Sequence, residues 1–90
     1  MEYTEMLKFY ILKSGMSANK IVEKLKQKGV HIDRSYISKL KNGKVGYPAS
    51  DEINIALAEI LEIDDPVKFR LAALKEKIPP DLYEYIKNVG

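Results

Sequence analysis

Cationic and hydroxyl side chains gather in the segment from Arg34 to Gly43, where their spacing places them on one side of a short helix. Ile37 and Leu40 are three residues apart and point inward together, with Ile32 ahead of them. At about 100° per residue, the opposite side of this helix carries hydrogen-bonding groups. These groups are Ser35, Ser38, Lys39 and Asn42, flanked by Arg34 and Tyr36. The major groove of DNA accepts such a helix, so the chemistry indicated is non-covalent recognition of bases and phosphates.

The charge of the chain is divided unevenly along its length. Residues 1–50 hold ten Lys and Arg and four Asp and Glu, a net charge of +6. Residues 51–90 hold five Lys and Arg and nine Asp and Glu, a net charge of −4. Eight of the cations lie within residues 20–44, around the predicted helix. A basic face for phosphates and an acidic remainder facing solvent or another protein explain this division; a solvated lysine-rich surface is the alternative.

Length and composition limit the class of protein. Ninety residues with 46% hydrophobic content make one small domain with a single core. The absence of cysteine excludes disulfides and thiolate metal sites and fits a reducing cytosol. The acidic start Met1-Glu2-Tyr3-Thr4-Glu5 is not typical of a signal peptide, and no apolar run reaches membrane-spanning length. We therefore expect a cytoplasmic, nucleoid-associated protein without a membrane partner.

Two helices are predicted before the cationic segment. Thr4 is the expected cap of the first, which ends at Ser14-Gly15. Ser17 caps the second, and Gly29 follows it as a stop. The inward-facing residues of these helices are Leu7, Tyr10, Ile11, Ile21 and Leu25.

The cationic helix and its successor have equally clear ends. Asp33 is the expected N-cap of a helix over residues 34–41, and Asn42-Gly43 is its stop. Glycines and a proline make residues 43–49 a loop. Ser50 then caps a fourth helix that begins with two acids. Its inward-facing residues are Ile53, Leu57, Ile60 and Leu61.

Proline marks the start of the last two helices. Asp65-Pro66 opens a fifth helix, and Pro79-Pro80-Asp81 opens a sixth. The residues expected inside the core from the fifth helix are Val67, Leu71 and Leu74. The sixth carries an apolar stripe of Leu82, Tyr85, Ile86 and Val89. This stripe is either core or a subunit interface, and we favour an interface because five helices already close a core.

Three segments together resemble the helix-turn-helix of lambda-repressor-like (Cro/cI, Xre-type) regulators. Residues 15–25 and 36–44 are similar to its two helices, and residues 48–61 are similar to the fourth helix of bacterial and phage members. The resemblance implies an all-α domain of five helices plus a short sixth. Residues 1–63 would form the helix-turn-helix core. Residues 64–90 would form a helical extension packed on that core and a possible dimerisation element.

Three positions depart from the pattern of that family. Val22 stands where a small residue usually lies at the helix crossing, and Ala18 stands where a glutamine often donates to a phosphate. The connection over residues 26–31 is longer than usual, which predicts an extra turn on the second helix. That extra turn would stack Lys24 and Lys28 on one face, where both could reach phosphates.

The resemblance implies a sequence-specific, double-stranded-DNA-binding transcriptional regulator, expected to be a repressor. Arg34 suits bidentate contact with guanine, Lys39 reaches a second base, and serine hydroxyls both donate and accept. The expected base-contacting residues are Arg34, Ser35, Ser38 and Lys39. The expected phosphate-contacting residues are Ser17, Asn19, Lys20, Tyr36, Asn42, Lys44 and Tyr47. Such domains bind two-fold-symmetric operators as homodimers.

Other readings remain open. The same scaffold could serve as a protein-interaction module for an antirepressor or an antitoxin-like partner. Tyr36 could cover the edge of the core instead of touching DNA. An enzyme is not expected: there is no cysteine nucleophile, no phosphate-binding glycine loop and no acidic partner for His31. The pair Asp64-Asp65 is typical of a helix start, and no cofactor is expected.

Overall fold

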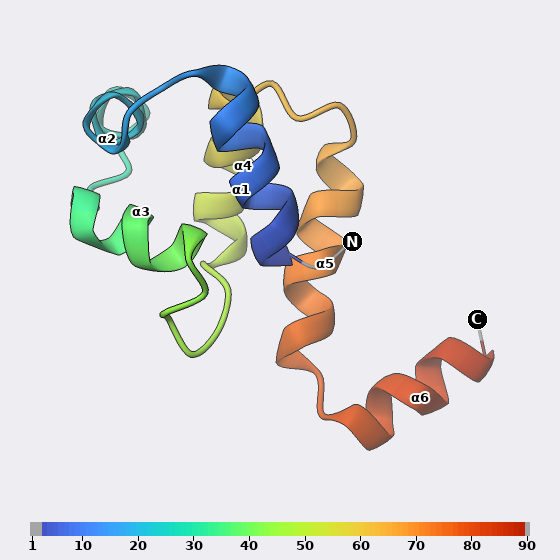
Figure 1. Ribbon diagram of the computed structural model, residues 1–90. Coiled ribbons are helices and arrows are strands. Elements are labelled where there is room, and N and C mark those ends of the chain that lie inside the picture. Colours follow the sequence, from blue (N-terminus) through green and yellow to red (C-terminus); the bar gives the residue numbers. More distant parts are fainter. Residues whose placement is uncertain (1–2, 90) are drawn as a thin grey trace.

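The computed structural model describes residues 3–89, and the side chains of residues 3–87. These residues form helices and no strand, so the prediction of an all-α chain is confirmed (Figure 1). The helices are α1 (Tyr3–Ser14), α2 (Ala18–Gln27), α3 (Arg34–Lys41), α4 (Asp51–Ile60), α5 (Pro66–Lys77) and α6 (Pro80–Val89). None of them is long and apolar enough to cross a lipid bilayer.

Side-chain caps open four of these helices, as the sequence predicts. In each case the cap accepts a hydrogen bond from the backbone N–H three residues later, at 2.8–3.4 Å. These caps are Ser17, Asp33, Ser50 and Asp65. The prediction for Thr4 is wrong, because α1 already includes Tyr3. Tyr3 is buried in the core from this first turn, with its ring stacked on Phe69 at 5.0 Å.

Left-handed glycines end the helices on either side of the α2–α3 connection. Gly29 has φ +82° and Gly43 has φ +69°. Beyond each glycine a backbone N–H returns to the last turn, from Val30 to Leu25 O at 2.9 Å and from Lys44 to Lys39 O at 2.8 Å. Helix α2 continues as far as Gln27, so the connection over residues 26–31 begins as helix and its remainder is a loop.

The end of α4 has the same backbone geometry without a glycine. Glu62 has φ +51°, a left-handed conformation, while the N–H of Ile63 returns to Ala58 O at 2.9 Å. A side chain with Cβ is strained at such an angle. Glu62 is therefore a position at which the sequence does not suit the backbone.

We expect Glu62→Gly to raise the free energy of unfolding by about 1 kcal/mol, because glycine adopts positive φ without this strain. The matched control is Glu52→Gly inside α4, where glycine should lower it by about 1 kcal/mol. Urea unfolding followed by circular dichroism measures both. Equal destabilisation by the two variants would contradict a strained Glu62.

A single core lies between the first five helices. The predicted core residues Leu7, Ile21, Ile37 and Leu57 are at most 2% exposed. The prediction for α5 is wrong: Val67, Leu71 and Leu74 are 60%, 53% and 45% exposed. The buried residues of α5 are Phe69, Ala72 and Ala73.

Helix α5 is apolar on two opposite sides, and side-chain shape decides which side is buried. Phe69 is completely buried against Tyr3, and α5 packs on both α1 and α4. Ala72 and Ala73 lie on the same side and are small enough to let α5 approach its neighbours closely. Rotating α5 to bury Leu71 would expose Phe69. It would also place larger leucine side chains where the two alanines now allow close packing.

Helix α6 extends away from the body of the molecule (Figure 1). Among the described residues it is absent from the helix pairs that pack together. The Cα radius of gyration is 13.5 Å, against about 12 Å for a compact chain of this length. Three predicted stripe residues, Leu82, Tyr85 and Ile86, are exposed, while the side chain of Val89 lies outside the described residues.

Candidate nucleic-acid interface

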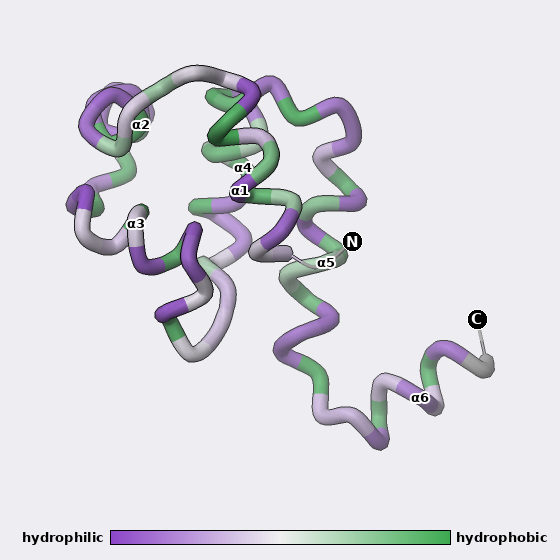
Figure 2. Tube along the Cα trace, in the orientation of Figure 1, coloured by the Kyte–Doolittle hydropathy of each residue, from purple (hydrophilic) through white to green (hydrophobic). Residues whose placement is uncertain are grey.

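Helix α3 is fixed to the core by one side and open to solvent on the other. Ile37 and Leu40 are 2% and 3% exposed and anchor it, and the Asp33 cap fixes its start. The predicted base-contacting residues Arg34, Ser35, Ser38 and Lys39 are all exposed. In the hydropathy view, hydrophilic segments of α3 and of the loop after it alternate with hydrophobic ones (Figure 2). The open side offers cationic donors and hydroxyl groups in one row.

The start of α2 adjoins this open side of α3. A hollow of about 270 Å³ lies between α1, α2 and α3, with Ile21 and Ile37 among its lining residues. Ser17 from the start of α2 and Ser38 and Lys41 from α3 line the same hollow. Lys41 is absent from the predicted contacts, although it lies seven residues, about two turns, after Arg34. That spacing was the available signal for a further cation on this side.

The predicted phosphate contacts of α2 are exposed at its start. Ser17 accepts the Lys20 N–H at 3.2 Å, which leaves its hydroxyl hydrogen able to donate. Asn19 is exposed, and the Lys20 ammonium lies 3.9 Å from the Glu23 carboxylate. An ion pair of this length between two exposed groups is weak, so the Lys20 ammonium stays available to an anion.

The remaining predicted phosphate contacts lie at the end of α3 and in the following loop. Asn42, Lys44 and Tyr47 are exposed. Tyr36 is half-buried and packs against the core, as in the alternative that gives it a covering role. Burial, with a smaller effect from the nearby Tyr47, raises the pKa of the Tyr36 phenol. Both phenols therefore lie on the side of α3 that meets the loop.

Lys28, which the sequence predicts to reach phosphates, has an acidic partner within the chain. The Lys28 ammonium lies 3.1 Å from the Glu59 carboxylate of α4, so it faces that helix. Lys24 lines the same surface hollow, together with Glu59 and Glu62. The acidic end of α4 packs beside α2 and attracts these lysines. Attraction within the chain therefore competes with any role of the α2 extension in binding phosphates.

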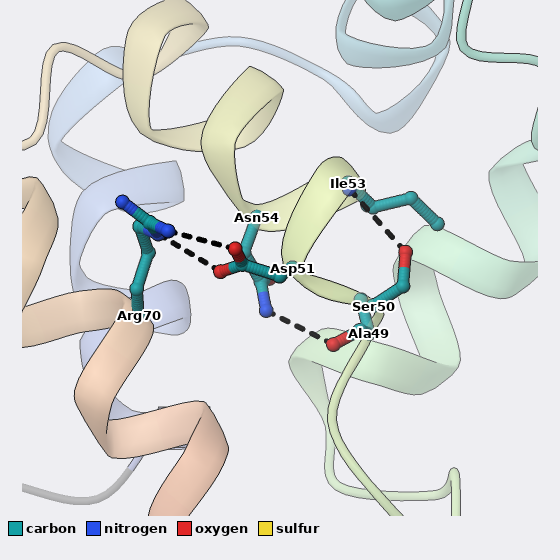
Figure 3. A network of polar contacts seen from close by, with 6 residues as sticks. All are labelled: Ala49, Ser50, Asp51, Ile53, Asn54 and Arg70. Carbon is teal, nitrogen blue, oxygen red and sulfur yellow. Dashed lines mark hydrogen bonds and ion pairs between the residues drawn. The ribbon is translucent and has the colours of Figure 1, made fainter.

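A buried polar network holds the loop that follows α3. The Tyr3 hydroxyl donates to Asn54 Oδ1 at 2.6 Å. Asn54 Nδ2 in turn donates to the Ala49 carbonyl at 3.0 Å (Figure 3). Asn54 is completely buried and is the only buried polar side chain in the described part of the chain. The network joins the first residue of α1 to the last turn of the loop before α4. It thereby fixes the end of the loop where the chain enters α4.

A second contact ties α5 to the start of α4. The Arg70 guanidinium donates two hydrogen bonds to the Asp51 carboxylate, each 2.8 Å (Figure 3). These bonds lower the pKa of Asp51. The Lys77 ammonium also donates to the Ala49 carbonyl at 3.3 Å. Sequence reasoning missed both networks because the bonds from Tyr3, Arg70 and Lys77 join residues 19 to 51 apart, which no local pattern relates.

Burial raises the pKa of the Tyr3 phenol far above its usual value. The folded chain therefore keeps a proton that an unfolded tyrosine loses near pH 10. This part of the free energy of unfolding is complete below pH 10 and falls above it, by up to about 1.4 kcal/mol per pH unit. We expect Tyr3→Phe to lack this dependence, whereas lysine titration is common to both proteins. Urea unfolding of both proteins between pH 8 and about pH 11 measures the difference in their free energies of unfolding. Parallel plots of these free energies against pH would contradict the prediction.

Within residues 3–87 no three His, Asp or Glu side chains are grouped to hold a metal ion. The exposed groups of α3 are hydrogen-bond donors and cations. Comparisons with known protein families, curated proteins and solved structures gave no match.

Proposed function

We propose that this chain is a helix-turn-helix DNA-binding domain of the lambda-repressor-like type and acts as a transcriptional repressor. Helix α3 enters the major groove, and the start of α2 with the loop after α3 meets the backbone on either side. Bound at a promoter, such a domain would block access to it. The operator is expected to be two-fold symmetric.

The observation that supports this proposal is the free side of α3. Arg34, Ser38 and Lys39 are exposed on a helix whose other side is anchored in the core. No ion pair within the described side chains uses Arg34, Lys39 or Lys44. These charges are therefore not neutralised inside the chain. A rigid row of such donors matches the acceptors of guanine and of phosphates.

Selection from a random pool of double-stranded DNA tests the proposal directly. We expect one short sequence to be enriched, with affinity that falls steeply as salt rises because phosphate-bound cations are released. The slope of log affinity against log salt estimates the number of phosphates contacted. Absence of both enrichment and salt dependence would overturn the proposal.

A protein-interaction module is the second candidate, and the exposed apolar residues of α5 and α6 favour it. A partner such as an antirepressor would bury them. The two functions predict different salt dependences for binding to DNA. An interaction module without a DNA role shows no steep salt slope on random DNA.

A further inference from the structure

Two apolar faces of this chain are left without a covering neighbour. The α5 stripe consists of Val67, Leu71 and Leu74, which lie on the side opposite the core. The α6 stripe consists of Leu82, Tyr85 and Ile86. Each side chain is about half exposed or more, and hydrophobic residues recur along both helices (Figure 2). Adjoining apolar surface on this scale is typical of an interface.

The connection between α5 and α6 holds them apart in a V (Figure 1). Ile78 is extended, with φ −92° and ψ 130°, as a residue before proline must be. Pro79 and Pro80 then fix two successive φ angles. One contact between the two helices places the Lys75 ammonium 5.3 Å from the centre of the Tyr83 ring. The α6 stripe is therefore kept off the α5 stripe of its own chain.

We propose that the α6 stripe of one copy lies on the α5 stripe of a second copy, and that the exchange is reciprocal about a two-fold axis. The two stripes are similar in size, since each presents three large side chains. The two helices as a whole differ in net charge: α5 carries four cations, one of them (Arg70) paired with Asp51, and one acid, whereas α6 carries two acids and one cation. The difference favours the approach of α6 to the α5 of a second copy.

The area is sufficient for a specific pair. Two reciprocal contacts of this kind bury on the order of 1,200 Å², the lower end of stable interfaces. A two-fold arrangement uses both stripes of both copies and leaves none exposed. It also leaves α3, on the far side of the core from α6, uncovered in each copy (Figure 1). The pairing does not depend on DNA binding and can be measured without DNA.

Sedimentation equilibrium of the full chain and its variants tests the pairing. We expect the unaltered chain to dimerise, and Leu71→Asp or Ile86→Asp to raise the dimer dissociation constant by about tenfold or more. The matched control is Leu12→Asp on α1, because Leu12 is 70% exposed but belongs to neither stripe. Circular dichroism checks that all three variants keep their helices.

Engineered cysteines identify which faces meet, because the chain has no cysteine of its own. Leu71→Cys chains mixed with Ile86→Cys chains should be joined by a short bismaleimide faster than either chain with itself. A chain that carries both substitutions tests whether α6 folds back onto α5 of the same copy, because the reagent would then link the two cysteines within one chain. Glu84→Cys in place of Ile86→Cys is the control from another side of α6.

Several results would overturn the proposal. A monomeric unaltered chain, a dimer that survives Leu71→Asp, or a link formed only within one copy each would do so. Loss of helix in Leu71→Asp would place this stripe in the core and count against it as well. Failure of DNA binding with the pairing intact would reject only the proposed repressor function.

Discussion

Replacing Arg34 with alanine should weaken binding to the selected DNA sequence by about 1–3 kcal/mol and relax preference at one base pair. Arg34 opens α3, is exposed and makes no ion pair among the described side chains. Its guanidinium presents two parallel donors that fit guanine O6 and N7. Removing it should delete the proposed base contact, while the buried Ile37 and Leu40 keep the helix in place.

Lys44→Ala is the matched control, because it removes a cation from the loop and not from the groove-facing row. It should weaken binding to all sequences alike and lower the salt slope by about one ion. Fluorescence anisotropy with the selected sequence and a scrambled duplex, repeated over a salt series, separates the two effects. If Arg34→Ala leaves the selected sequence unchanged, α3 does not read the groove as proposed.

Local signals in the sequence predict most of the fold. Capping depends on a side chain and the backbone three residues away, so Ser17, Asp33 and Ser50 could be assigned without tertiary information. The same holds for Gly29 and Gly43, whose left-handed conformation is a local property. The bounds of α3 follow from two such signals.

Tertiary choices could not be predicted in the same way. Helix α5 has apolar residues on opposite sides, and hydrophobic spacing alone favours the side with Leu71 and Leu74. The neighbouring helix α1 determines which side of α5 is buried instead, because its Tyr3 ring stacks on Phe69. In the candidate site, the outward row of α3 was predictable from helical spacing. The pairing of Lys28 with Glu59 was not, since it depends on how α2 and α4 cross.

The largest effect on stability is expected at Asn54. Its side chain satisfies two buried groups at once, accepting from the Tyr3 hydroxyl and donating to the Ala49 carbonyl. Asn54→Ala takes away the acceptor of the Tyr3 hydroxyl beside a completely buried position, while the Ala49 carbonyl keeps its bond from the Lys77 ammonium at 3.3 Å. A stranded hydroxyl costs about 1–3 kcal/mol and the second lost bond about 1 kcal/mol, so the free energy of unfolding should fall by about 2–4 kcal/mol.

Two comparisons make this a test of the network. Tyr3→Phe removes one hydroxyl and leaves only Asn54 Oδ1 unsatisfied, so it should cost less than Asn54→Ala. Asn19→Ala changes an exposed asparagine of α2 and should stay within about 0.5 kcal/mol of the unaltered chain. Urea unfolding ranks the three variants, and an Asn54→Ala cost as small as that of Asn19→Ala would show that the network does not hold the fold. If it does, Asn54→Ala should also loosen the loop after α3 and lower DNA affinity at temperatures where the domain remains folded.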